Sequence, residues 1–324
     1  MADIDADLIV IGAGPAGLTA AQYGARANLS VLVLEQLAPG GQVLLIDALE
    51  NYPGIAPGKT GYEFSEDLHR QAESFGAKFK TEQVMAMGKE ENVFTVSLDK
   101  GIKIRAYAVI VATGAKHRTL DIPGEKEFFG RGVSYCATCD GPFFRNKKVF
   151  VVGGGDAACD EAQYLSHLTD KVILVHRRER FRAQKALAER VMQNPKIELR
   201  FNTVLKEIRG ADGAKVSSVV LGRPADGNDY RDNTVESADG VFIFTGTIPQ
   251  TRLVSGENGG VKADLDDAGY IITDQKMAAS VPGLYAAGDV RSTPFRQVVT
   301  AAGDGAIAAH CAAAYIDGLK GNAY

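Results

Sequence analysis

Two stretches of the chain repeat the same order of apolar and glycine-rich segments. In the first, an apolar run at residues 8–11 leads into Gly12-x-Gly14-x-x-Gly17 and then into an alanine-rich stretch with helical spacing. A second apolar run at residues 31–34 ends in Glu35. Continuous apolar runs of this length are typical of parallel strands that are buried on both faces. The order of strand, glycine-rich turn, helix and strand therefore predicts a βαβ unit.

The same order returns later in the chain. An apolar run at residues 149–152 leads into Gly153-x-Gly155-x-x-Ala158, and residues 172–175 supply the following strand. Two such units in one chain predict an α/β fold with two Rossmann-like nucleotide-binding domains.

Each glycine of the first motif has an expected task. Gly12 permits the tight turn, Gly14 lets a pyrophosphate approach the backbone, and Gly17 lets helix and strand pack closely. The phosphate charge would then lie at the N-terminus of the helix. Glu35 is placed to accept hydrogen bonds from the ribose of an adenosine. The alternative is a glycine-rich turn in some other α/β fold.

The second unit carries bases where the first carries an acid. His176 occupies the position equivalent to Glu35, and Arg177, Arg178 and Arg182 follow it. A carboxylate would repel the 2′-phosphate of NADPH, whereas a guanidinium can bind it with charge-assisted hydrogen bonds. The pattern therefore favours NADPH over NADH at this site. A solvated basic start of a helix is the alternative.

Two short segments are expected to connect the domains. Ala112-Thr113-Gly114-Ala115 follows the apolar run 108–111, and Thr245-Gly246-Thr247-Ile248-Pro249 lies after the second unit. We expect an FAD-binding domain built from residues 1–117 and 248–324, with an NADPH-binding domain at 118–247 inserted into it. In the returning segment, Gly288-Asp289 follows an apolar strand, and this aspartate could hydrogen-bond the polyol chain of FAD or simply be an exposed turn residue.

A closely spaced pair of cysteines lies between the two glycine-rich motifs, in Cys136-Ala-Thr-Cys139-Asp140. Such a pair indicates either a redox-active dithiol or part of a zinc site. Structural zinc usually needs four ligands, and neither Cys159 nor Cys311 comes with a second closely spaced Cys or His. We therefore expect a redox pair and no metal, with Cys159 and Cys311 filling small apolar positions.

The composition restricts the partners. The 324 residues are 45% hydrophobic and 23% charged, with a formal net charge of −4, which is typical of a two-domain globular protein. Nothing in this balance attracts nucleic acid, and no apolar run is long enough to span a membrane. Because residues 1–7 are acidic where a secretory signal would be basic, we expect a cytoplasmic protein.

A long polar stretch from Arg209 to Gly240 predicts a hairpin with loops and no binding role. Its turn dipeptides are Asp212-Gly213, Asp226-Gly227 and Asn228-Asp229. The alternating residues 216–220 favour an edge strand.

The motifs together resemble the low-molecular-weight, bacterial-type thioredoxin reductases of the class II pyridine nucleotide-disulfide oxidoreductases, over nearly the whole chain. The segments that carry the resemblance occur in family order: 12–17, Gly40-Gly41-Gln42, Glu50-Asn51-Tyr52-Pro53-Gly54, Ala112-Thr113-Gly114, 136–141, 153–158, His176-Arg177-Arg178, Gly288-Asp289 and Arg296-Gln297. Cys159 departs from the pattern, since an aliphatic residue is common there.

The resemblance implies a homodimer, a non-covalent FAD and the roles of single residues. Gln42 and Asn51 would lie near the flavin, Asp289 on the ribityl chain, and Arg296, Gln297 and Val298 along the isoalloxazine. Cys139 would face the flavin, Cys136 would attack the disulfide of a protein partner, and Asp140 would protonate the departing thiolate.

The motifs and the resemblance together predict which residues bind each cofactor. For FAD we predict Gly12, Gly14, Pro15, Ala16, Gly17, Glu35, Gln36, Gly41, Gln42, Asn51, Val84, Ala112, Thr113, Gly114, Gly288, Asp289, Arg296, Gln297 and Val298. For NADPH we predict Gly153, Gly155, Asp156, Ala157, His176, Arg177, Arg178 and Arg182.

The implied activity is that of thioredoxin-disulfide reductase (NADPH), with electrons passing from NADPH through FAD and the Cys136–Cys139 pair to oxidised thioredoxin. A related flavoprotein that uses NADH or ferredoxin, or that reduces another thioredoxin-like disulfide, is the nearer alternative. A non-enzymatic redox sensor is the more distant one.

Overall fold

The chain folds into two compact units. The computed structural model describes residues 4–46, 49, 51–56, 58–99, 101–211, 214–224, 230–256 and 260–322. The first unit comprises Met1–Lys116 and Ile248–Tyr324, and the inserted unit comprises His117–Thr247. The segments that connect the units, β7 (Ala115–His117) and β16 (Thr247–Pro249), pair with each other as two strands.

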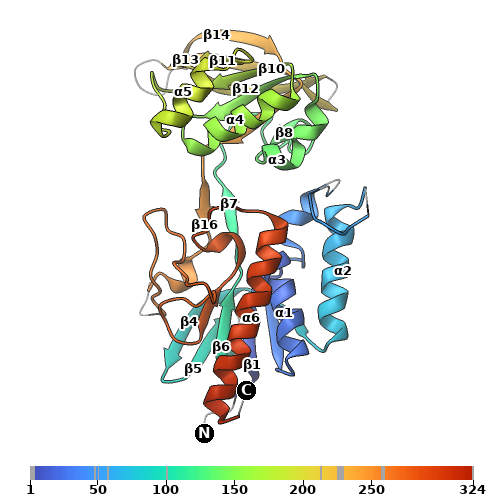
Figure 1. Cartoon of the computed structure of the whole chain (residues 1–324), viewed down its shortest axis with the longest axis vertical. Helices are drawn as coiled ribbons and strands as arrows, with labels where there is room; N and C mark the ends of the chain where they lie inside the picture. Colours follow the sequence, from blue (N-terminus) through green and yellow to red (C-terminus); the bar gives the residue numbers. More distant parts are fainter. Residues whose placement is uncertain are drawn as a thin grey trace. The chain divides into compact units, whose positions relative to one another are not determined.

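The first unit is built around one sheet with helices packed against it (Figure 1). Its further elements are β1 (Ala6–Ile11), α1 (Pro15–Arg26), β2 (Val31–Glu35), the 3-10 helix η1 (Gly41–Leu45), α2 (Gly61–Ser74), β3 (Lys78–Thr81), β4 (Val84–Glu90), β5 (Val93–Leu98), β6 (Lys103–Val111), the 3-10 helix η3 (Arg252–Val254), β17 (Leu284–Ala286), the 3-10 helix η5 (Gly288–Val290) and α6 (Val298–Lys320).

Strand β6 organises this sheet. Within the described residues the sheet has seven strands in the order β3-β2-β1-β6-β5-β4, with β17 also paired to β6. The first half of β6 pairs antiparallel with β5, while its second half pairs parallel with β17. Strands β1, β2 and β3 continue the parallel part. The carboxyl ends of β1, β2 and β6 therefore share one edge, where Rossmann-like folds bind their cofactors.

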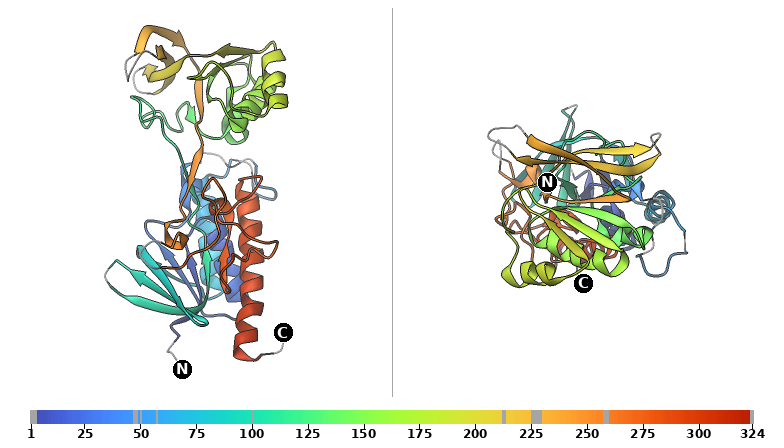
Figure 2. Two further views of the ribbon diagram at one scale, coloured as in Figure 1. Left: turned by 90° about the vertical axis from the view of Figure 1, so that its left-hand side faces the viewer. Right: turned by 90° about the horizontal axis from the view of Figure 1, so that it is seen from above.

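Both faces of the parallel strands are buried, which explains their continuous apolar runs. Leu8 and Val10 pack with α1 and α6, whereas Ile9 and Ile11 pack against residues from the β4–β5 hairpin and from 254–290. Figure 1 shows α1 and α6 side by side, and the side view in Figure 2 shows α6 and the hairpin on opposite sides of this unit.

The inserted unit repeats the architecture on a smaller scale. Its elements are β8 (Val133–Ser134), α3 (Ala137–Asp140), the 3-10 helix η2 (Gly141–Phe144), β9 (Lys148–Gly153), α4 (Asp156–Leu168), β10 (Lys171–Val175), α5 (Lys185–Gln193), β11 (Ile197–Arg200), β12 (Val204–Ala211), β13 (Lys215–Pro224), β14 (Tyr230–Ser237) and β15 (Gly240–Phe244).

Two sheets form the core of the inserted unit. Strands β11-β10-β9-β15-β8 form a parallel sheet, and β12-β13-β14 form an antiparallel one. Residues Phe150 and Val152 of β9 face the antiparallel sheet, while Val149 and Val151 face α4 and α5. The predicted fold class, two Rossmann-like α/β domains with one inserted into the other, is confirmed.

One expectation for the polar stretch is wrong. Residues 216–220 lie in β13, which pairs with β12 on one side and β14 on the other, so this segment is a central strand. Val216 and Val219 are buried in the core. The alternation correctly indicates a strand, but it carries no information about how many neighbours that strand has. The dipeptides 212–213, 226–227 and 228–229, and Glu50, lie outside the described residues.

The contact between α1 and α6 generates a stability prediction. A Cβ atom at Gly305 would overlap the carbonyl oxygen of Ala16, whereas a Cβ atom at Gly303 of the same helix would meet nothing within 4 Å. We expect Gly305→Ala to lower the free energy of unfolding by about 1 to 3 kcal/mol, because the two helices must separate. Gly303→Ala should instead be neutral or stabilise by up to about 1 kcal/mol. Denaturant unfolding of both variants checks this, and equal effects would contradict it.

Candidate functional site

The first glycine-rich turn has the geometry that its sequence predicts. Gly12 has φ of 100° and follows β1, and a Cβ atom at Gly17 would overlap the carbonyl oxygen of Gly12. A Cβ atom at Gly14 would meet nothing within 4 Å. The backbone at Gly14 thus borders open space at the N-terminus of α1, where Pro15 opens the helix without needing an acceptor for an amide.

Glu35 closes this turn from the end of β2. Its Oε2 accepts a hydrogen bond from the Ala13 amide (2.8 Å) and its Oε1 accepts one from the Leu37 amide (3.0 Å). Each carboxylate oxygen has a second lone pair. The side chain is therefore fixed by the protein and can still accept hydrogen bonds from ribose hydroxyls. The neighbouring Gln36 is exposed.

A second loop lies against the turn. The Gly40 amide donates to the Ala13 carbonyl (2.7 Å), and a Cβ atom at Gly41 would lie 3.3 Å from the Cα of Gly14. Gln42 Nε2 donates to the carbonyl oxygen of Ala115. The predicted FAD residues Gly14, Gly41 and Gln42 are thus grouped in the first unit.

The C-terminal segment joins the same group. A Cβ atom at Gly288 would lie 3.0 Å from the Cβ of Ala16, so η5 packs at the start of α1. The Gly288 amide donates to Asp304 Oδ2 (3.1 Å), which also pairs with Arg291 Nη1 (3.2 Å). Burial raises the pKa of the neighbouring Asp289. The sequence did not indicate Asp304, because its partners are distant along the chain.

Two residues predicted to lie near the flavin contact each other. Asn51 Nδ2 donates to Gln297 Oε1 (2.9 Å), although 246 positions separate them. Gln297 is the N-cap residue of α6, and Val298 is its first helical residue. Segments from opposite ends of the chain therefore meet here.

The guanidinium of Arg296 is held in place by an aromatic ring, and one of its hydrogen-bond donors has no acceptor among the described residues. Its guanidinium lies over the ring of Tyr270, 4.2 Å from the centroid, a cation–π contact. Its Nε is buried and has no hydrogen-bond partner among the described residues. Buried donors are normally satisfied, so this atom indicates a missing acceptor. An oxygen or nitrogen of a bound ligand would supply one.

Most of the remaining predicted FAD residues follow the end of β6, whereas Val84 lies on the neighbouring β4–β5 hairpin. Ala112 and Thr113 follow β6, and Thr113 Oγ1 donates to the Gln250 carbonyl (2.7 Å). The Gln250 amide donates to the Gly114 carbonyl (2.9 Å), which fixes the residue before β7, the first connecting strand. Val84 is buried at the start of β4. Open space at Gly14, the free capacity of Glu35 and the unsatisfied Arg296 together fit a dinucleotide such as FAD.

The second glycine-rich turn follows the same design with one substitution. A Cβ atom at Gly155 would meet nothing within 4 Å, so the start of α4 is open to a ligand. Ala158 replaces the third glycine and is fully buried. A Cβ atom at Gly154 would overlap the imidazole of His176, which is 6% exposed. Burial lowers the pKa of His176, so its ring is neutral and packs on the turn.

The arginines after His176 extend from a loop that is tied to this turn. Arg177, Arg178 and Arg182 are exposed. The Arg182 amide donates to the Gly154 carbonyl (2.7 Å). Asp156, predicted to bind NADPH, accepts from the Gln184 amide (2.7 Å) and so anchors the end of the loop. The neighbouring Ala157 is exposed at the start of α4.

The cysteine pair forms a disulfide in the structure, with 5.3 Å between its Cα atoms. Cys136 is the N-cap residue of α3, and its Sγ accepts a hydrogen bond from the Cys139 amide (3.2 Å). Ala137 is buried against α4, which fixes the short helix to the inserted unit. Asp140 ends α3 and its amide donates to the Cys136 carbonyl (3.1 Å).

Sequence reasoning missed two hydroxyls beside the disulfide. Thr138 Oγ1 lies 3.4 Å from Cys136 Sγ. Ser134 Oγ accepts from the Cys136 amide (3.0 Å) and donates to the Cys136 carbonyl (3.2 Å). The position of Thr138 inside the CxxC motif was the available signal. Because a thiolate is a strong acceptor, the Thr138 hydroxyl favours a negative charge on Cys136 after reduction, while the Ser134 hydroxyl holds the backbone of Cys136.

The other predicted roles of cysteine are partly confirmed. Cys159 is fully buried, and burial raises the pKa of its thiol to about 11, so it is an inert filler of the core. Cys311 is only half-buried.

Across the described part of the chain, no group of three or more His, Cys, Asp or Glu side chains is arranged to hold a metal ion. In the same residues, no helix is long and apolar enough to cross a membrane.

Comparisons with known proteins agree with this geometry. Residues 6–305 match the family model described as pyridine nucleotide-disulphide oxidoreductase. The chain belongs to this family. It is 54% identical over 319 residues to a thioredoxin reductase of Treponema pallidum, covering 98% of this chain and 99% of the relative. It is 44% identical over 316 residues to one from Listeria monocytogenes, covering 97% and 95%.

A solved structure extends the likeness to three dimensions. The crystal structure of thioredoxin reductase from Streptococcus pyogenes matches with a TM-score of 0.88 at 42% identity, covering 97% of this chain and 98% of that one. The resemblance predicted from the motifs is therefore confirmed.

The hydroxyl of Thr138 provides a direct test of the dithiol's surroundings. Thr138→Val preserves the shape of the side chain and removes the hydroxyl, so the reduced enzyme should form the Cys136 thiolate at higher pH. A hydrogen bond to a charged group is worth about 1.5 to 3 kcal/mol, which corresponds to roughly a tenfold or larger loss of thiolate near neutral pH. Ultraviolet absorbance of the thiolate during a pH titration measures this. Thr138→Ser should restore the wild-type curve, and a wild-type curve for Thr138→Val would contradict the assignment.

Proposed function

We propose that this protein is an NADPH-dependent thioredoxin reductase. The observation that carries the proposal is the Cys136–Cys139 disulfide, whose Cys136 sulfur accepts a hydrogen bond from the Cys139 amide. It lies in the unit with the second glycine-rich turn. The relatives that bear the name thioredoxin reductase match this chain over nearly its full length.

We assign FAD to the first unit. Gly12 to Gly17 would hold its pyrophosphate, Glu35 its adenosine ribose, and Asp289 its ribityl chain. The unsatisfied Nε of Arg296, together with Gln297, would hold the flavin ring. When bound, FAD would accept electrons from NADPH and deliver them as a pair to the disulfide. The protein's part is to fix these groups before the cofactor binds.

We assign NADPH to the inserted unit. The open turn at Gly155, the N-cap residue of α4, suits its pyrophosphate, because the N-terminus of a helix favours a phosphate group. The exposed Arg177, Arg178 and Arg182 suit the 2′-phosphate. The burial of His176 favours a supporting role, in which its ring holds the arginine loop against Gly154.

The reduced cysteine pair can then exchange with a partner disulfide. The Cys136 thiolate attacks one sulfur of that disulfide, the partner's disulfide bond breaks, and its second sulfur leaves as a thiolate. Asp140 is placed in sequence to give that thiolate its proton. The Cys139 thiol next attacks the Cys136 sulfur, the mixed disulfide breaks, and the proton of Cys139 passes to the partner sulfur that leaves, so the enzyme disulfide is restored and the partner is released as a dithiol. Two electrons pass to the partner, thioredoxin.

Two further assignments rest on the family alone. We propose a homodimer, and we propose the cytoplasm as its location, where a reduced dithiol persists.

Serine variants separate the roles of the two cysteines. Cys139→Ser should trap a mixed disulfide between Cys136 and thioredoxin, because the thiol that resolves it is missing. Cys136→Ser should trap none, and both variants should lose NADPH-dependent reduction of thioredoxin. Non-reducing electrophoresis detects the trapped species, and Cys311→Ser serves as the control with normal turnover. Trapping through Cys139 in place of Cys136 would reverse the assignment.

The arginine loop should determine the choice of coenzyme. We expect Arg177→Ala and Arg182→Ala each to raise the KM for NADPH by roughly tenfold to a hundredfold, because each loses a charge-assisted hydrogen bond. The KM for NADH should change little. Arg190→Ala, an exposed arginine on α5, is the control. Equal effects on the two coenzymes would refute the assignment, and reduced ferredoxin as the better donor would favour the alternative activity.

A further inference from the structure

The buried carboxylate of Glu125 contacts Tyr135, the residue immediately before Cys136. Glu125 is 1% exposed, an unusual position for an acid. Its oxygens accept hydrogen bonds from the amides of Leu120 (2.9 and 3.0 Å) and Asp121 (2.7 Å). The hydroxyl of Tyr135 donates to its Oε1 (2.7 Å). The family-level function uses neither Glu125 nor Tyr135.

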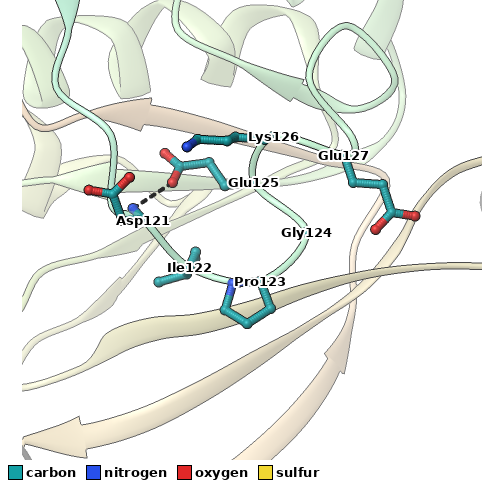
Figure 3. A pocket seen from close by; sticks show the side chains of 7 residues that line it. All are labelled: Asp121, Ile122, Pro123, Gly124, Glu125, Lys126 and Glu127. Atoms are coloured by element: carbon teal, nitrogen blue, oxygen red, sulfur yellow. Dashed lines mark hydrogen bonds between the residues drawn. The ribbon is translucent and has the colours of Figure 1, made fainter.

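The loop that carries Glu125 is anchored to the antiparallel sheet. Gly124 has φ of 84°, and a Cβ atom there would overlap the carbonyl oxygen of Ile208 in β12. The Ile208 amide donates to the Pro123 carbonyl (3.0 Å). Figure 3 shows the Glu125 carboxylate turned back toward Asp121, beside a pocket of about 440 Å³ lined by Asp121–Glu127. The loop that carries the carboxylate is therefore fixed against β12.

Tyr135 is held on its ring faces as well as at its hydroxyl. The imidazole of His117 stacks on it with 4.8 Å between centroids and 11° between planes. Phe129 packs on it at 5.5 Å. Burial and the Glu125 carboxylate raise the pKa of Tyr135, so the hydroxyl keeps its proton and remains a donor. One side chain is thus fixed by three others.

Tyr135 is the residue directly before Cys136 in the chain. The hydroxyl of Ser134 holds the amide and carbonyl of Cys136. The hydrogen bond from the Cys139 amide to Cys136 Sγ spans 3.2 Å and requires a fixed backbone at Cys136. Displacement of Tyr135 would weaken this bond, and with it the stabilisation of a Cys136 thiolate.

We propose that Glu125 and Tyr135 are positioning residues for Cys136, with the Glu125 carboxylate holding the tyrosine hydroxyl so that the sulfur stays within reach of its donors. The inference rests on the proposed function, in which Cys136 is the attacking thiol. His117, at the start of the inserted unit, stacks on the same tyrosine and is the last residue of β7, the first connecting strand. The reactivity of the dithiol is thereby linked to the conformation of residues 117–121.

The test measures the rate at which iodoacetamide alkylates Cys136 in the dithiothreitol-reduced holoenzyme at neutral pH. Tyr135→Phe keeps the ring and removes the hydroxyl, and Glu125→Gln removes the charge. We expect each to slow alkylation by roughly 3- to 10-fold, the value of one hydrogen bond. Both variants act on one contact, since Tyr135→Phe removes its donor and Glu125→Gln replaces its charged acceptor with a neutral one, so the double variant should be no slower than the slower single variant. Reduction of the bound flavin by NADPH should proceed at the wild-type rate in all three.

Thr119→Val is the matched control, since it removes an exposed hydrogen bond to Asp121 Oδ1 (3.0 Å) from the same segment. It should alkylate at the wild-type rate. Wild-type alkylation in both Tyr135→Phe and Glu125→Gln, or equal slowing in the control, would overturn the inference. If a variant melts at a lower temperature and its flavin reduction also slows, the role is general stability and the inference fails. Failure of the proposed function would show differently, as a wild-type enzyme that does not reduce thioredoxin with NADPH.

Discussion

The chemistry of this protein depends on how the sulfur of Cys136 is held. The backbone amide and carbonyl of Cys136 form hydrogen bonds with the hydroxyl of Ser134, and the Cys136 sulfur accepts one from the Cys139 amide. These are local contacts, and the packing of α3 on α4 through Ala137 supports them from below. A dithiol in a loose loop would have the same residues without a preferred thiolate. The inserted unit thus gives the short helix that carries the cysteine pair a fixed conformation.

Close approach of backbones has the same importance in the first unit. The turn at Gly12, the start of α1 and the 3-10 helix at Gly288 meet with almost no side chains between them. This leaves amides and the Glu35 carboxylate around an open space at Gly14. The same unit also holds the Nε of Arg296, which has no partner among the described residues, and the Asn51–Gln297 pair, which joins segments 246 positions apart. The arrangement needs both halves of the first unit, so the chain must return to this unit after the inserted one.

Much of this could be predicted from the sequence, because the motifs combine local geometry with residue type. The tasks of Gly12, Gly14 and Gly17 follow from spacing and a preceding apolar run. Asp304 and Tyr270 could not be found in this way, since each acts on a partner that only the fold brings near. The central position of β13 was missed because alternation reports burial of one face and not the number of neighbouring strands. His176 stays a predicted NADPH residue, and the sequence could not show that its ring is buried against Gly154 directly after a buried strand.

We propose above all that a bound flavin and the Cys136–Cys139 pair exchange electrons. An anaerobic reductive titration of the purified holoenzyme tests it most directly, by counting the electrons taken up per flavin. The account predicts two two-electron centres in the wild type and only the flavin centre after serine replacement of either cysteine. A wild type that takes up a single electron pair, with no change in the serine variants, would contradict it.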